Sequence, residues 1–189
     1  VMARSVRNTN QESLLCVDYI NLYDYEAEQF FTYEDKSDFM PVIKKEDKEH
    51  LEVVIFGANS MGRAVARILA HVAHYPNCQN ANHRSRITIV SENVEEWTRE
   101  FMASHRGLFC LSNWMLTDAN GVTELHSPVE EYGDYLDIEW HFVYGTSTSI
   151  DLESLFCENS VKRIVVCEDS DTQSIHTTLH LPTTFKDVK

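Results

Sequence analysis

The sequence predicts a three-layer α/β sandwich around a parallel sheet, with a hairpin insertion and an N-terminal arm. Four short apolar runs are separated by stretches with helical periodicity, and the first run enters its helix through a glycine-containing turn. Such strands are joined by right-handed crossovers and are therefore parallel. With the first strand central, the predicted order is 3-2-1-4, as in doubly wound folds. The four predicted strands are residues 52–56, 86–90, 138–144 and 163–167.

Residues 1–50 lie outside this regular pattern and are interpreted as an arm and a linker before the main domain, residues 51–189. The segment "SLLCVDYINLYDY" is compatible with a strand pair or with an irregular arm, and the charged stretch around Pro41 is typical of a linker. The many aromatic side chains of the arm argue against full disorder. We therefore expect the arm to pack on the main domain or on a partner.

Two amphipathic helices are expected after the first two strands. The second is expected to begin at an N-cap pair, Asn93 and Glu96. Arg63 and Arg67 fall outside the apolar stripe of the first helix, so solvent exposure is favoured over phosphate contact. The expected buried stripes are Met61, Ala64, Val65, Ile68, Leu69 and Val72 in the first helix, and Val94, Trp97, Phe101 and Met102 in the second.

The segment of about residues 108–130 interrupts the alternation of strands and helices. Asn120-Gly121 between two strand-like runs predicts a β-hairpin with a two-residue turn. A short helix within "TSIDLESLFCEN" and a last helix within "DSDTQSIHTTLHL" complete the pattern.

Composition excludes some classes of function. The formal net charge is −14, so binding to nucleic acid or anionic lipid through a basic face is not expected. No run approaches the length of a membrane span. The five cysteines form no C-x-x-C pair, and Cys157 and Cys167 lie in apolar runs typical of the core. The cysteine pattern indicates a reducing compartment, hence the cytoplasm.

The turn from Gly57 to Gly62 is the candidate phosphate-binding element. A diphosphate binds at a helix N-terminus where the backbone allows close approach. Gly57 permits a tight exit from the strand, and Gly62 permits close packing of helix on strand. Asn59 stands where a middle glycine is usual, but Asn tolerates positive φ. The alternative is that both glycines serve strand–helix packing alone. The candidate residues are Gly57, Ala58, Asn59, Ser60, Met61 and Gly62.

The ends of the later strands supply further candidates. Ser91 and Glu92 follow the second strand, where an acidic residue takes ribose hydroxyls; alternatively, Glu92 is a solvated charge at a helix start. Asp169 and Asp171 follow the fourth strand and either take ribose hydroxyls or cap the last helix.

Neither a catalytic set nor a metal site is predicted. His71, His74, Cys78 and His83 are interpreted as a solvated cluster, and His176 and His180 as one face of a helix.

Residues 51–181 resemble the nucleotide-binding N-terminal domain of the TrkA family, also called the regulator-of-potassium-conductance (RCK) domain. The similar stretches are "VVIFGANSMGRAVARIL", "ITIVSEN" and "FVYGTSTSIDLESLFCENSVKRIVVCEDSDTQSIHTTLHL". The resemblance implies a Rossmann fold that binds NAD(H) or another adenine nucleotide and regulates ion transport. It adds Gly145, Thr146 and Glu168 to the candidate ligand contacts, with Thr146 where the family has aspartate. It also implies a homodimer that acts on a membrane transporter or on a further domain of the same chain.

These observations favour a regulatory domain that binds a nucleotide without turnover. Two alternatives stay open: an NAD(P)-dependent oxidoreductase, and a degenerate Rossmann scaffold for protein interaction. The outer edge of the fourth strand has unpaired backbone N–H and C=O groups, so another segment is expected to cover it. Three covers are compatible with the sequence: the arm at Leu14–Tyr19, the hairpin, or a second subunit.

Overall fold

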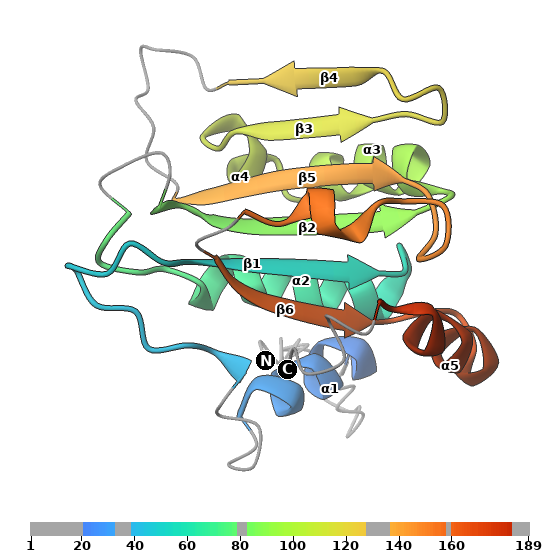
Figure 1. Cartoon of the computed structure of the whole chain (residues 1–189), viewed down its shortest axis with the longest axis horizontal. Coiled ribbons are helices and arrows are strands. Elements are labelled where there is room, and N and C mark those ends of the chain that lie inside the picture. The colour runs from blue at the N-terminus through green and yellow to red at the C-terminus, as the bar shows by residue number, and fades with distance from the viewer. Residues whose placement is uncertain (1–20, 33–38, 79–82, 128–136, 158–159, 183–189) are drawn as a thin grey trace, which may run out of the picture.

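The computed structural model describes residues 21–32, 39–78, 83–127, 137–157 and 160–182. It is an α/β fold with a six-stranded mixed sheet and is consistent with a Rossmann-like architecture (Figure 1). In chain order, the elements are α1 (Leu22–Thr32), β1 (His50–Phe56), α2 (Ser60–Val72), β2 (Ser85–Ser91), α3 (Val94–Ser104), α4 (Arg106–Cys110), β3 (Trp114–Thr117), β4 (Thr123–His126), β5 (Ile138–Tyr144), the 3₁₀ helix η4 (Leu152–Leu155), β6 (Ser160–Val166) and α5 (Asp171–His180).

The four predicted strands correspond to β1, β2, β5 and β6, and they pair side by side in parallel, as predicted. The order of the whole sheet, however, is β4-β3-β5-β2-β1-β6, not 3-2-1-4. The hairpin β3–β4 is not a separate insertion, because β3 pairs in parallel with the outer edge of β5. Since β4 returns antiparallel to β3, the sheet is mixed and not purely parallel.

The predicted hairpin is present, but its turn is longer than two residues. Thr117 pairs with Thr123, so residues 118–122 form the connection. The N–H of Gly121 donates to the Asp118 carbonyl (3.0 Å), and Gly121 has a φ of 75°. The Asp118 carboxylate accepts from the N–H groups of Asn120 and Val122, which favours this wider turn.

The helices cover the two faces of the sheet unequally. α2, α3 and α4 pack on one face, and the other carries η4 and the segment around it (Figure 1). α1 packs on the outside of α2 and is tied to it by an ion pair from Arg67 to Asp24 (2.9 Å). Part of the arm is therefore a helix, not a strand. Leu14–Tyr19 lies outside the described residues.

The buried surface of α2 is wider than the predicted stripe. Ala66 and Ala70, outside that stripe, are buried as well. Val72, inside the stripe, is exposed because it lies in the last turn, at the end of the helix. The stripe of α3 is mostly as predicted, with Val94, Trp97 and Phe101 buried. Asn93 stands at the N-cap of α3, but its side chain accepts a hydrogen bond from Ser91 and makes no capping bond.

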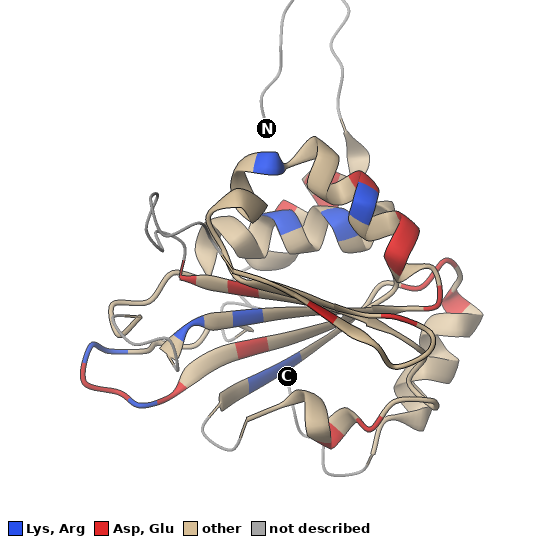
Figure 2. Ribbon diagram, turned by 90° about the horizontal axis from the view of Figure 1, so that it is seen from above, with Lys and Arg blue, Asp and Glu red and all other residues tan. Residues whose placement is uncertain are grey.

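A row of charges of alternating sign crosses the sheet near the amino ends of the parallel strands (Figure 2). Lys162, Glu52, Arg86 and Glu139 occupy paired positions on β6, β1, β2 and β5, and we call this row the charge ladder. Arg86 donates to Glu52 (2.7 Å) and contacts Glu139 (3.5 Å). Burial alone raises the pKa of Glu52, but hydrogen bonds from His50, the Cys157 N–H and Ser160, with the charge of Arg86, lower that pKa to about 2.

The two cysteines predicted to be buried differ. Cys167 is 8% exposed and belongs to the main core, whereas Cys157 is exposed beyond the end of η4. The apolar residues of that segment that are buried are Leu152 and Phe156. Among the described residues, no helix has the length and apolar character needed to cross a bilayer.

Candidate functional site

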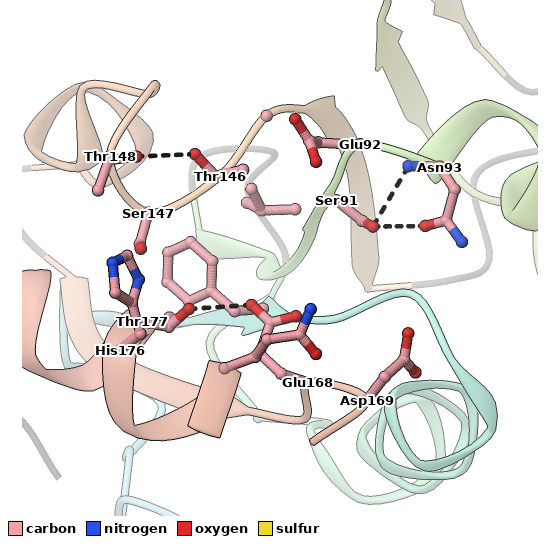
Figure 3. A pocket seen from close by; sticks show the side chains of 14 residues that line it. Ser91, Glu92, Asn93, Thr146, Ser147, Thr148, Glu168, Asp169, His176 and Thr177 are labelled. Carbon is pink, nitrogen blue, oxygen red and sulfur yellow. Dashed lines mark hydrogen bonds between the residues drawn. The ribbon is translucent and has the colours of Figure 1, made fainter. Parts of the chain in front are cut away.

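A cavity of about 450 Å³ opens at the carboxyl ends of β1, β2, β5 and β6. From β1 the chain proceeds to β2 and β5 on one side and returns to β6 on the other, so the strand order reverses here. Ligands of open α/β sheets bind at such a reversal. Figure 3 shows the cavity. Its lining is Phe56, Val90, Ser91, Glu92, Asn93, Gly145, Thr146, Ser147, Thr148, Glu168, Asp169, Gln173, His176 and Thr177.

The structure distributes the predicted ligand contacts over three places. Ser91, Glu92, Gly145, Thr146 and Glu168 come together in the large cavity. Ala58, Asn59 and Ser60 line a smaller groove of about 220 Å³ over the N-terminus of α2. Met61 instead faces an apolar cavity among α1, α2 and β6. Gly57 and Gly62 form the turn itself.

Both glycines of the turn are required by close backbone contact. Gly57 has a φ of 109°, and a Cβ there would lie 2.0 Å from the Cys167 carbonyl oxygen. A Cβ on Gly62 would lie 2.2 Å from the carbonyl oxygen of Gly57. These contacts hold β1, α2 and the end of β6 together. They explain the glycines by packing alone, whether or not a phosphate binds above them.

The Asn59 side chain occupies the space above the turn. Its Oδ1 accepts from the N–H of Gly62 (2.9 Å) and caps α2. Its Nδ2 donates to the carbonyl of Cys167 and to the carboxylate of Asp169 (3.0 Å). We call these three bonds the Asn59 bridge. It spans from α2 to the end of β6 and uses a helix N–H that a phosphate would otherwise bind.

Hydroxyl groups gather on the β5 side of the cavity. The N–H of Gly145 donates to the carbonyl of Ser91 (3.3 Å), which holds the ends of β5 and β2 together. In the following loop, the Thr146 N–H donates to the Ser149 hydroxyl (2.7 Å), and the hydroxyls of Thr146 and Thr148 lie 3.1 Å apart. This side of the cavity thus offers several small donors and acceptors.

The β6 side of the cavity is acidic. Glu168 and Asp169 follow β6, and Glu92 lines the same cavity from the end of β2 (Figure 3). Glu168 accepts from the Thr177 hydroxyl (3.0 Å). Burial and the charge of Glu168 raise the pKa of the Cys167 thiol to about 12. Among the described residues that line the cavity, none is a lysine or an arginine.

The two acidic candidates after β6 do not cap α5. The cap is Ser170, whose hydroxyl accepts from the N–H of Gln173 (3.3 Å). Asp169 instead belongs to the Asn59 bridge, and Asp171 lies in the first turn of α5. Gln173, His176 and Thr177 line the cavity from the same helix. Their spacing of three to four residues on one helical face is the signal that sequence reasoning had not used.

The Arg63 side chain is 34% exposed. It lines the groove beside Ser60, lies over the ring of Trp97 (5.8 Å) and pairs with Glu100 (3.1 Å). Its Nε is buried without a hydrogen-bond partner among the described groups. Arg63 is therefore the cation nearest to the turn that an anion in the groove would meet.

A second cluster with metal-ligand chemistry lies at the opposite end of the strands. Ligand atoms of His50, Glu52 and Cys157 lie within 4.8 Å of one another. However, an Arg86 nitrogen lies 2.7 Å from Glu52 and 3.4 Å from the Cys157 sulfur. The guanidinium thus occupies the place of a cation in this cluster.

Two histidines of the predicted solvated cluster have partners within the protein: His74 pairs with Asp137, and His83 hydrogen-bonds the Asn77 carbonyl.

Comparison of the chain with family models, with curated proteins and with solved structures found no match.

Proposed function

We propose that this chain is a regulatory domain that binds an adenine nucleotide, with NAD(H) among the candidates, and transmits the bound state without turnover. One observation carries the proposal. The cavity lies where the strand order reverses, beside a strand–turn–helix with the two glycines that close packing requires. The TrkA-like sequence pattern supports the same ligand class and a cytoplasmic regulator of ion transport.

The chemistry of the lining supports an adenosine group in the large cavity. Phe56 and Val90, buried core residues at the ends of β1 and β2, form an apolar floor beneath the cavity. Glu92 and the hydroxyls around Thr146 provide acceptors for ribose hydroxyls. The adjoining groove, which shares Asn93 with the cavity, provides the Ser60 hydroxyl and Arg63 for a phosphate.

A thermal-shift panel tests the proposal directly. Adenosine, AMP, ADP, ATP, NAD⁺, NADH and NADP⁺ are each added to the full chain, and a ligand that binds only the folded state raises the melting temperature. Glu92→Gln should weaken the effective ligand about tenfold, because it removes a charged acceptor for ribose. Glu95→Gln is the matched control, since Glu95 lies nearby in the first turn of α3 and does not line the cavity. No shift with any compound would overturn the proposal.

A second candidate function is a scaffold that binds protein and leaves the cavity empty. The Asn59 bridge favours it, because it fills the phosphate position of the turn with a side chain of the protein itself. A panel without any thermal shift would favour this scaffold.

We also propose that the chain forms a homodimer and acts on a membrane transporter or on a further domain of the same chain. Among the described residues, β6 pairs with one strand, β1, and no described strand pairs with its other edge. On α5, Ile175 and Leu179 are 60% and 67% exposed and lie one turn apart. Light scattering tests the dimer. Replacing Ile175 and Leu179 with glutamate should yield monomers, and Thr178→Glu on the same helix should not. A full chain that is monomeric at micromolar concentration would contradict the proposal.

A further inference from the structure

The Asn59 bridge closes the path that a dinucleotide takes across the sheet edge. In open α/β sheets a dinucleotide crosses the crevice at the strand reversal, with its diphosphate over the glycine turn. Here Asn59 connects the N-terminus of α2 with the Cys167 carbonyl and the Asp169 carboxylate, on either side of that crevice. From this arrangement we infer that Asn59 determines the ligand class: the site takes an adenosine compound with at most one phosphate and rejects dinucleotides.

Two physical effects act together against the diphosphate. The N–H of Gly62 already donates to the Asn59 carboxamide, so a phosphate at this point must displace a satisfied hydrogen bond. The Asp169 carboxylate, held at 3.0 Å from the Asn59 amide, would then face a second anion at close range. In the larger cavity, no described lining residue is a lysine or an arginine that could offset this repulsion.

A single phosphate avoids both effects. The groove beside the turn offers the Ser60 hydroxyl and the Arg63 guanidinium, which pairs with Glu100 (3.1 Å), and it lies on the α3 side of Asn59. Glu96 and Glu100 also line this groove, so their charges oppose a second phosphate there. An adenosine monophosphate with its nucleoside in the large cavity reaches this groove past Asn93, which lines both. The Asn59 bridge then remains closed.

This inference rests on the proposed nucleotide-binding function, and calorimetry on the full chain separates the two. The probes are adenosine, AMP and NAD⁺. For the natural sequence, AMP should bind at least about tenfold more tightly than NAD⁺. Asn59→Gly should raise NAD⁺ affinity about tenfold while adenosine affinity changes by less than about threefold, because the Gly62 N–H becomes available and the crevice opens. Glycine is well tolerated at helix N-caps, so this variant should fold.

Asp169→Asn provides a second route that leaves the turn intact. It removes the charge and should raise NAD⁺ affinity more than adenosine affinity, so the ratio of the two affinities should change several-fold in favour of NAD⁺. Asn120→Gly in the distant hairpin turn is the matched control and should change nothing. Tighter binding of NAD⁺ than of AMP by the natural sequence would overturn the inference, as would an unchanged NAD⁺ to AMP ratio in both variants. If none of the three probes binds either the natural sequence or Asn59→Gly, the proposed function itself fails, and the inference fails with it.

Discussion

The two ends of the parallel strands differ in whether their charged side chains have partners of opposite charge. At the amino ends, the charge ladder pairs acidic with basic side chains across neighbouring strands. At the carboxyl ends, Glu92, Glu168 and Asp169 line a cavity to which no described lysine or arginine contributes. Charges that stabilise a fold have their partners within the fold. Acidic groups that converge on a cavity without such partners are available to a ligand, which is why we place the function at the carboxyl edge.

The largest effect is expected from filling the turn at the carboxyl edge. Gly62→Val places a Cβ about 2.2 Å from the Gly57 carbonyl oxygen, so α2 must move away from β1. We expect a loss of about 4 kcal/mol or more in the free energy of unfolding, together with loss of nucleotide binding. Urea denaturation and calorimetry measure the two.

Gly107→Ala is the matched control for this variant, because nothing lies within 4 Å of a Cβ at that position in α4. It should leave stability unchanged or raise it by up to about 1 kcal/mol. If Gly62→Val kept the stability and the ligand affinity of the natural sequence, the turn would be neither closely packed at Gly62 nor part of the ligand site.

The next largest effect concerns the charge ladder. Glu52 is 1% exposed and accepts from Arg86 and from the Cys157 N–H, both at 2.7 Å. Glu52→Gln removes the negative charge beside a partly buried guanidinium and should lower the free energy of unfolding by about 3 kcal/mol. Glu139→Gln, at the outer and more exposed end of the ladder, is the control and should cost less. Equal losses for the two variants would mean that burial does not set the strength of the ladder.

The ladder also predicts a pH dependence. The folded pKa of Glu52 is about 2, below its ordinary value of 4.5, so its contribution is complete above about pH 4.5 and is lost as the pH falls toward 2. The pKa of Glu139 is also lowered: burial alone would raise it, and His141 and Arg86 more than offset this. Denaturant midpoints measured across this range should fall more steeply for the natural sequence than for Glu52→Gln. Parallel curves would exclude Glu52 as the source.

The elements that the sequence predicted well are those with local periodicity. The four core strands and the stripes of α2 and α3 come from patterns that repeat within ten to twenty residues. The sequence also contains a local indication of the charge ladder. Each of the first three apolar runs carries one charged residue near its start, namely Glu52, Arg86 and Glu139, and the fourth follows Lys162 and begins with Arg163. Their alternating signs match the observed neighbours and registers.

Other features depend on contacts between distant residues. Asn59 bonds to groups 108 and 110 residues away, and nothing in its local sequence indicates them. The pairing of β3 with β5 depends in the same way on which sheet edge is free to accept a hairpin. In contrast, the burial of Ala66 and Ala70 had a local indication, since both are small apolar residues of α2 outside its predicted stripe.

The smallest effect is expected where the carboxyl edge is most acidic. Glu168 accepts one hydrogen bond, from Thr177, and lies in the same cavity as Asp169 and Glu92. Glu168→Gln keeps an acceptor for Thr177 and relieves repulsion between like charges, so stability should change by less than about 1 kcal/mol. The same substitution at Glu52 costs several times more, because there the carboxylate has a cation partner. Melting temperatures of the two variants, recorded side by side without ligand, measure this contrast. A loss for Glu168→Gln as large as that for Glu52→Gln would mean that the carboxyl edge is as fully partnered as the ladder, and the main reason for placing the function there would be gone.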